Sequence, residues 1–142
     1  MNFAIVGATG NVGRKTVDIL EKYKIKIDKL FLVASKRSLG KTITFKKKNI
    51  KIEALESYNF AKAKITFFAA GSIIAKKWAP IAAKKTIVID NSKYFRMDKN
   101  ISLVVPEVNE KALKIYKKRN IIANPNCSTA QLVLALKPLH DK

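Results

Sequence analysis

The sequence predicts an α/β fold, a doubly wound and mostly parallel sheet with helices on both faces. Strand-like and helix-like segments alternate along the 142 residues, as they do in folds of this kind. The strand-like segments are unbroken apolar runs, which is typical of parallel strands covered on both sides. A glycine-rich turn at residues 7–13 joins the first strand to the first helix. The length fits one domain with its own core.

The first half of the chain predicts two buried strands, a helix and a hairpin. Residues 2–6 and 30–34 are short apolar runs that fit buried strands. Apolar residues over 11–23 recur with helical spacing. Residues 42–45 and 50–52 flank a polar, lysine-rich turn and predict the hairpin.

The second half continues the alternation. Its last helix is apolar on nearly all sides, which predicts a buried helix. Asn109 is expected to be the N-cap of the preceding helix, which runs to about residue 118. The expected strands are residues 65–68, 86–89, 102–105 and 121–122, and the expected helices are residues 73–84, 109–118 and 128–136.

The chain is strongly basic, with 29 Lys and Arg against 10 Asp and Glu and a formal charge of +19. Such a charge is typical of proteins that bind nucleic acid or anionic membranes. Lysine outnumbers arginine 25 to 4, however, and the lysines lie in scattered short runs without the interleaved aromatic residues of single-strand binders. We therefore favour a lysine-coated surface over a nucleic-acid interface.

Three features predict a cytoplasmic protein without a membrane partner. No apolar stretch reaches the ~18–20 residues of a membrane span. The first residues lead directly into a strand, with none of the regions of a secretory signal. The single cysteine, Cys127, excludes an internal disulfide and fits a reducing compartment.

The turn at residues 7–13 has the pattern G-x-x-G-x-x-G between a strand and a helix. The glycines permit a tight turn and close approach of the backbone to a diphosphate, and the helix N-terminus adds unpaired N–H groups. In this context the pattern predicts a dinucleotide site, the alternative being a glycine-rich turn without a ligand. The candidate cofactor-binding residues are Gly7, Thr9, Gly10, Asn11, Val12 and Gly13.

The residues after the second strand indicate which dinucleotide binds. NAD-binding folds commonly place Asp or Glu there to hold the ribose 2′-hydroxyl. This chain has Ser35, Lys36, Arg37 and Ser38 instead. Hydroxyls and a guanidinium accept a 2′-phosphate that a carboxylate would repel. Ser35, Arg37 and Ser38 therefore predict NADP as the cofactor, the alternative being a solvated basic loop.

Cys127 opens the last helix and follows Pro125, which disfavours helix for Asn124. A helix N-terminus favours the reactive thiolate. A free cysteine can also be a small buried apolar residue. Beside a dinucleotide loop, a thiolate is suited to oxidising or reducing an acyl group through a thioester. Cys127 is therefore the candidate nucleophile, and we expect its sulfur at the same sheet edge as the glycine turn.

Five segments together resemble the N-terminal part of the aspartate-semialdehyde dehydrogenase family, in its order and spacing. The resemblance covers the whole chain but only part of the family's length. It implies a Rossmann-type sheet and the NADPH-dependent reductive dephosphorylation of aspartyl phosphate to aspartate semialdehyde, a step of amino-acid biosynthesis. The segments are residues 7–13, residues 34–40, residues 88–92 with 95–97, residues 104–109, and residues 124–129.

The resemblance also implies residue roles. Cys127 attacks the acyl phosphate and forms a thioester, which then receives hydride. Arg96 and Asn126 match positions that bind the substrate's phosphate, although from its residue type alone Arg96 could equally form a surface salt bridge. Ser35, Arg37 and Ser38 match the 2′-phosphate binders.

A further match lies near the nicotinamide. Ala70 and Gly71 match the end of the family's Ser-Ala-Gly segment. Ala69 stands where that segment has serine, so one hydroxyl is lost, and Lys93 replaces another usual serine.

The resemblance implies that residues 1–142 are the NADP-binding domain of a longer, homodimeric enzyme and end just after the nucleophile helix. We expect the second domain, with the family's catalytic histidine, to be absent. His140 cannot replace that histidine, because the helical rise places it about 20 Å from Cys127. We expect no metal site, no turnover by the chain alone, and association through an exposed apolar last helix.

Two other interpretations remain open. The chain could be a non-catalytic dinucleotide- or nucleic-acid-binding module that has kept the fold. A second polypeptide could also supply the missing domain in trans.

Overall fold

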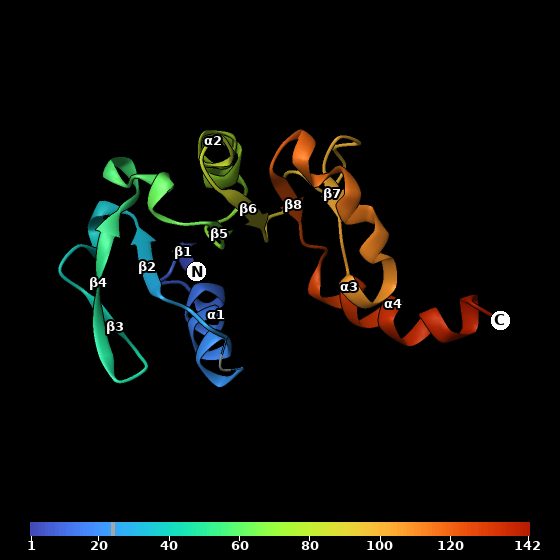
Figure 1. Ribbon diagram of the computed structural model, residues 1–142, viewed down its shortest axis with the longest axis horizontal. Helices are drawn as coiled ribbons and strands as arrows, with labels where there is room; N and C mark the ends of the chain where they lie inside the picture. The colour runs from blue at the N-terminus through green and yellow to red at the C-terminus, as the bar shows by residue number, and fades with distance from the viewer. Residues whose placement is uncertain (24) are drawn as a thin grey trace.

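The protein is described from a computed structural model of residues 1–142, in which residues 1–23 and 25–142 are described. Strands and helices alternate along the chain (Figure 1). The strands are β1 (Asn2–Val6), β2 (Lys29–Ala34), β3 (Thr42–Phe45), β4 (Lys48–Ala54), β5 (Ile65–Phe68), β6 (Ile87–Asp90), β7 (Ser102–Leu103) and β8 (Ile121–Ala123). The α-helices are α1 (Asn11–Lys22), α2 (Ser72–Ala83), α3 (Pro106–Asn109) and α4 (Cys127–His140), and the 3₁₀ helices are η1 (Lys36–Ser38), η2 (Leu55–Ser57), η3 (Phe60–Lys62) and η4 (Glu110–Lys118).

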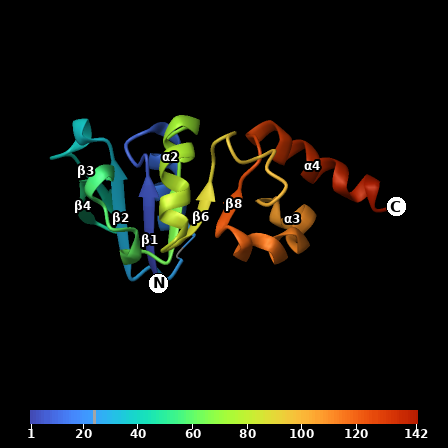
Figure 2. The ribbon, with the colours of Figure 1, turned by 90° about the horizontal axis from the view of Figure 1, so that it is seen from above.

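The strands form one sheet in the order β3-β4-β2-β1-β5-β6-β8-β7. All neighbouring strands are parallel except β3 and β4, which form an antiparallel hairpin at one edge. The predicted doubly wound, mostly parallel fold is therefore confirmed. Because β1, β2, β5, β6 and β8 run in the same direction, the loops that follow them all leave from one edge of the sheet, here called the carboxyl edge (Figure 2).

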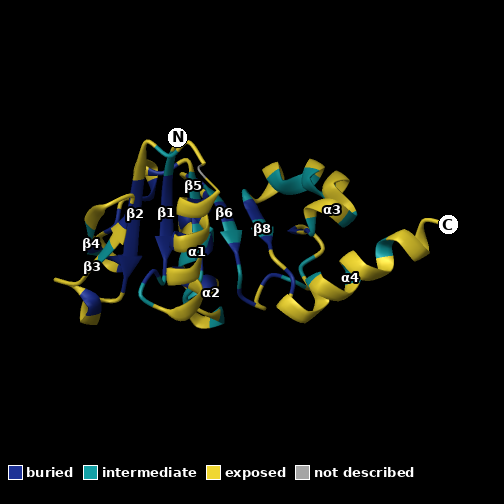
Figure 3. Cartoon of the chain, turned by 90° about the horizontal axis from the view of Figure 1, so that it is seen from below, coloured by how far each residue is buried: buried dark blue, intermediate teal, exposed yellow. Residues whose placement is uncertain are grey.

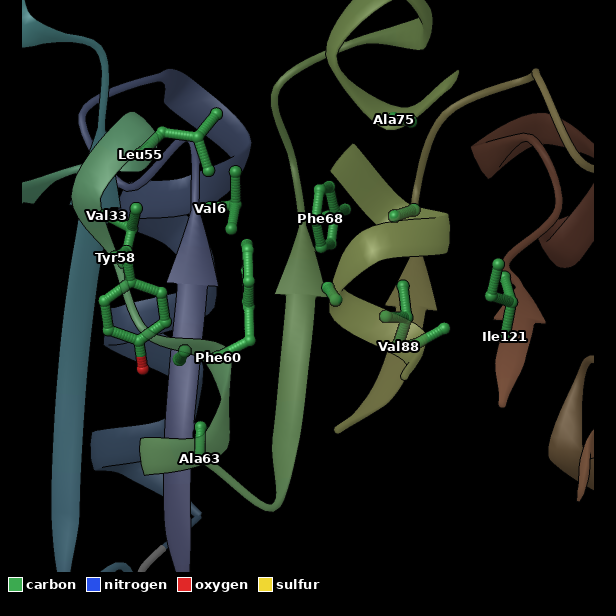
Figure 4. Close-up of a cluster of buried hydrophobic side chains, with 14 of the residues drawn as sticks. Val6, Val33, Leu55, Tyr58, Phe60, Ala63, Phe68, Ala75, Val88 and Ile121 are labelled. Atoms are coloured by element: carbon green, nitrogen blue, oxygen red, sulfur yellow. The ribbon is translucent and has the colours of Figure 1, made fainter. Parts of the chain in front are cut away.

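The core has two parts, one on each face of the sheet. On the α1 face, Val17 and Leu20 of the helix pack with Phe3, Ile5 and Leu32 of the strands. On the α2 face, a stripe of buried alanines lets the helix lie close to Phe68 and Val88 (Figure 4). The strands are buried on both faces because a helix covers each, as their unbroken apolar sequences require.

The hairpin turn is tighter than the sequence predicts. Phe45 pairs directly with Lys48, so only Lys46 and Lys47 form the loop. Both have positive φ, 49° and 63°, the geometry of a two-residue turn whose twist matches that of paired strands. Consequently β4 begins at Lys48 rather than at residue 50.

The expected helix cap at Asn109 is wrong. Its side-chain Oδ1 accepts a hydrogen bond from the Val105 backbone N–H at 2.8 Å, and its Nδ2 donates to the Leu103 carbonyl at 2.9 Å. These bonds close the turn after β7, which ends at Leu103 rather than at residue 105. The segment that follows is the 3₁₀ helix η4.

The expected exposure of the apolar last helix is confirmed among the described residues. No residue of α4 is buried, and Leu132 and Leu139 are 58% and 70% exposed. The helix projects from the end of the sheet, and the short helix α3 packs against it (Figure 3). The described residues therefore leave an apolar helix in contact with solvent, and its association stays a prediction.

Candidate active site

The glycine turn lies at the carboxyl edge, between β1 and α1. Gly7 donates its N–H to the Val33 carbonyl of β2 at 2.8 Å, and the Gly10 N–H returns to the Gly7 carbonyl at 3.0 Å. Gly10 is the N-cap of α1 and offers no side-chain acceptor. The first N–H groups of the helix are consequently free of a cap, which suits an incoming anion.

Two of the three glycines are sterically required. Gly7 has φ +84°, and a Cβ there would lie 2.7 Å from the Ala69 carbonyl oxygen. A Cβ on Gly13 would lie 2.2 Å from the Gly7 carbonyl oxygen and 2.7 Å from the Ala8 Cα. At Gly10 the nearest contact would be an ordinary 3.4 Å. The glycines thus let the backbones of β1, α1 and the end of β5 pack in close contact.

The residues predicted to hold the 2′-phosphate follow β2 at the same edge. Ser35 precedes η1 and is exposed, as is Arg37. Ser38 is buried, and its hydroxyl lies 3.3 Å from the Thr9 hydroxyl of the glycine turn. This contact joins the two predicted phosphate-binding loops.

A hollow of about 360 Å³, here called the carboxyl-edge hollow, lies on the α2 face beside the glycine turn. Its volume is in the range of small-molecule sites. Mostly apolar walls next to an open helix N-terminus fit the adenosine end of a dinucleotide. Five predicted residues lie among its walls, which are Val6, Gly7, Thr9, Gly10, Ala34, Ser35, Leu55, Glu56, Ala69, Ala70, Ile74 and Trp78.

The remaining predicted cofactor residues lie around this hollow rather than in its walls. Asn11 and Val12 are exposed in the first turn of α1, and Gly71 is the N-cap of α2, with φ +82°. Glu56 is a wall residue that sequence reasoning missed. It lies two strands from β1, and only the pairing of β2 with β4 brings it beside Ser35.

Cys127 lies at the same edge as the glycine turn. It follows β8, which is parallel to β6, and β6 and β1 are both parallel to β5. Three strand spacings of ~4.8 Å place the end of β8 about 14 Å from the end of β1. The thiol is exposed at the first position of α4.

Asn126 fixes the start of α4. Its side-chain Oδ1 accepts the Ser128 backbone N–H at 2.8 Å and lies 3.7 Å from the Cys127 sulfur, which can donate to it. The predicted phosphate-binding asparagine is therefore the helix N-cap. Its oxygen acts within the chain, and its Nδ2 group is the donor that it can offer to a substrate.

Arg96 connects the ends of β6 and β8. Its Nε donates to the Asn124 carbonyl at 2.9 Å and its Nη2 to the Asn91 carbonyl at 3.2 Å. The side chains of Asn91 and Asn124 also meet, with 2.6 Å between Oδ1 and Nδ2. Within residues 1–23 and 25–142, Arg96 forms no salt bridge. It is a half-buried cation beside the loop that carries Cys127, with guanidinium donors left for an oxyanion.

Beneath this loop, Asp90 ends β6 and is completely buried. Its carboxylate accepts the Ser92 N–H at 3.2 Å and the Ser92 hydroxyl at 2.6 Å. Burial raises the pKa of Asp90, while the hydrogen bonds from Ser92 and the nearby charge of Arg96 oppose the rise. Sequence reasoning missed the contacts of Asn124 with Arg96 and Asn91, because these partners are 28 to 33 residues apart along the chain. It missed Asp90 because the burial of this carboxylate depends on the tertiary fold.

His140 lies at the far end of α4, where its side chain is 87% exposed. The described residues contain no group of three or more His, Cys, Asp or Glu that could hold a metal ion. Nor is any described helix long and apolar enough to cross a membrane.

Comparison with known proteins identifies the family. Residues 2–116 match the family model of the semialdehyde dehydrogenase NAD-binding domain. The chain belongs to this family. Its N-terminal glycine turn, its hairpin and the Arg96 loop all lie within the matched part of the semialdehyde dehydrogenase domain, and Cys127 follows it.

Several semialdehyde dehydrogenases are similar over nearly the whole chain. Aspartate-semialdehyde dehydrogenase of Aquifex aeolicus is 52% identical over 98% of this chain and 42% of that protein. The structure of aspartate semialdehyde dehydrogenase II from Vibrio cholerae, complexed with ASA, matches with a TM-score of 0.97 and 48% identity, over 99% of this chain and 46% of that one. The Candida albicans enzyme with NADP matches with a TM-score of 0.76 and 27% identity, over 99% and 46%. The chain thus spans less than half of these relatives.

Proposed function

We propose that the chain is the dinucleotide-binding and nucleophile-bearing part of an NADP-dependent aspartate-semialdehyde dehydrogenase. One observation carries this proposal: the open glycine turn and the Cys127 thiol lie at the same edge of one parallel sheet. The family match and the similarity to aspartate-semialdehyde dehydrogenases support it. By the same similarity, we propose a cytoplasmic, homodimeric enzyme when complete.

The cofactor binds across the carboxyl edge. The diphosphate lies on the glycine turn and the N-terminus of α1, where no side-chain cap competes. The carboxyl-edge hollow would hold the adenosine, and Ala70 and Gly71 would contact the nicotinamide end. When bound, NADPH supplies the hydride. The proposed binding residues are Gly7, Thr9, Gly10, Asn11, Val12, Gly13, Ser35, Arg37, Ser38, Ala70 and Gly71.

NADP is preferred over NAD because the loop after β2 offers a cation and hydroxyls. Arg37 is exposed and unshielded beside Ser35, where a 2′-phosphate can reach both. Ser38 is tied to Thr9, so it fixes the loop relative to the diphosphate site.

The chemistry of the chain's own residues centres on Cys127. Its thiolate attacks the carbonyl carbon of aspartyl phosphate, a C–S bond forms, the C–O bond to phosphate breaks, and phosphate leaves with the bonding pair. Arg96 and the Nδ2 group of Asn126 stabilise the leaving oxyanion. A hydride from bound NADPH would reduce the thioester, and Cys127 would leave as the thiolate when the aldehyde forms.

The first test is protection of Cys127 from alkylation. Because the chain has one cysteine, intact mass after iodoacetamide treatment reports that residue alone. NADP should slow alkylation, and NAD should do so only at higher concentration. Arg37→Ala should abolish this difference between the dinucleotides, whereas the matched variant Arg119→Ala, remote from the edge, should keep it.

The opposite result favours the non-catalytic module. Equal alkylation rates with and without NADP, together with tight and steeply salt-dependent oligonucleotide binding, would exclude the dehydrogenase proposal.

The 142-residue chain alone should show no turnover. A dehydrogenase needs an acid/base near the thiol, and the one histidine lies at the other end of α4. The assay is phosphate-dependent reduction of NADP with aspartate semialdehyde. Measurable turnover would contradict the expectation, without affecting the binding proposal.

A further inference from the structure

The carboxyl-edge hollow contains one feature that its proposed phosphate-bearing ligand does not explain. Glu56 is the only charged residue among the described residues that line the hollow. The chain has 29 basic and 10 acidic residues, so a carboxylate is an uncommon choice for any surface position. A carboxylate beside a ligand with several phosphates costs binding energy unless it faces an uncharged, hydrogen-bond-donating part of that ligand.

The position of Glu56 is well defined by its neighbour. Leu55 is buried and lies above the tip of β1, close to Val6 (Figure 4). Leu55 therefore anchors η2, the turn that follows β4. Glu56 comes directly after this anchor, on the side of the hollow away from the glycine turn, because β4 is separated from β1 by β2.

The walls around Glu56 suit a flat aromatic ring. Leu55, Ile74 and Trp78 belong to the core cluster of the α2 face, and Ala34 lines the hollow from the end of β2. The exposed Ser35 and Arg37, in contrast, follow β2. A mostly apolar slot with one carboxylate among its walls is complementary to a purine ring that carries an amino group.

We propose that Glu56 is a specificity-determining residue for the adenine ring, its carboxylate accepting a hydrogen bond from the exocyclic 6-amino group. This inference rests on the proposed dinucleotide function and names the group that selects the base. The described residues give Glu56 no salt-bridge partner, so its carboxylate can accept from the ligand. Loss of the amino group would leave the acceptor without its donor, which is the usual source of such selectivity.

The test uses two ligands that differ only in this amino group. They are adenosine 2′,5′-bisphosphate and the corresponding 6-desamino purine riboside bisphosphate. Trp78 is the only tryptophan and lines the hollow, so its fluorescence reports binding to the 142-residue chain directly. The adenosine form should bind about tenfold more tightly, as expected for a hydrogen bond to a charged acceptor.

Three variants decide whether Glu56 causes the preference. Glu56→Ala should bind the two ligands within about twofold of each other, and Glu56→Gln, which keeps an acceptor oxygen, should show an intermediate ratio. The matched variant Glu110→Ala, on the exposed helix η4, should keep the wild-type ratio.

Two outcomes would overturn the proposal. If Glu56→Ala keeps the tenfold ratio, the carboxylate does not contact the amino group. If it binds both ligands more tightly by the same factor, Glu56 faces the 2′-phosphate instead. Binding of neither ligand by the wild-type chain would show that the dinucleotide site itself is wrong.

Discussion

The two ends of the candidate active site are built in different ways. The glycine turn lies over strands that are buried on both faces, and its geometry depends on backbone atoms that leave no space for a Cβ. The Cys127 loop is held instead by hydrogen bonds that the side chains of Arg96, Asn124 and Asn126 make. The first kind of site depends on packing and the second on polar contacts, so they should respond differently to mutation.

The largest difference in the free energy of unfolding should appear when apolar side chains are removed from the sheet and from α4. Phe68 of β5 is 1% exposed, and Phe68→Ala should lower the free energy of unfolding by about 3–5 kcal/mol, from lost burial and the cavity left behind. Leu139→Ala on α4, where the side chain is 70% exposed, should change it by no more than about 0.5 kcal/mol. Urea unfolding measures both. A comparable loss at Leu139 would mean that α4 is covered, for example by association.

The second largest difference should lie within the glycine turn. Gly13→Ala places a methyl against the Gly7 carbonyl and the Ala8 Cα, and should cost about 3 kcal/mol because backbone atoms must move. Gly10→Ala meets only an ordinary contact and should cost about 1 kcal/mol or less, the usual range for losing a good N-cap residue. Urea unfolding again compares them, and equal costs would show that the close crossing at Gly13 can relax.

A smaller effect, dependent on pH, should come from Asp90. Because burial raises its folded-state pKa, the stability linked to the protonated form is fully present below pH 3.8 and is lost as pH rises through the raised value. Asp90→Asn cannot ionise. The variant should therefore gain stability relative to wild type as pH increases across this window, in urea unfolding repeated at each pH.

Ser92→Ala is the control for Asp90. It removes the hydroxyl hydrogen bond that lowers the Asp90 pKa and keeps the backbone one, so the pH range over which Asp90→Asn gains stability should extend to higher pH. If the stability difference between Asp90→Asn and wild type does not vary with pH, the pKa of Asp90 is not raised in the folded state.

The same contrast explains what the sequence could predict. Gly7 and Gly13 can be predicted from the sequence because only glycine fits at these positions, which lie at a fixed spacing. The unbroken apolar strands likewise predict the parallel sheet. The contacts of Arg96 and Asn124, and the place of Glu56, depend on strand order, which no local pattern states. The apolar sequence of α4 indicates a helix that tends to be covered, but its burial depends on which elements pack against it, and among the described residues its leucines are exposed.

The smallest predicted effect concerns Tyr58, in the core on the α2 face. Its ring packs against Phe31 and Phe60, but its hydroxyl is buried without a hydrogen-bond partner in the described part of the chain. Tyr58→Phe keeps the ring and removes the unpaired hydroxyl, so it should raise the free energy of unfolding by up to about 1 kcal/mol. Tyr94→Phe, with an exposed side chain, should stay within about 0.5 kcal/mol of wild type. Burial and the charge of Glu53 raise the pKa of Tyr58, so the stability gained by Tyr58→Phe should grow above pH 10.0. A Tyr58→Phe variant less stable than wild type would show that the hydroxyl has a hydrogen-bond partner.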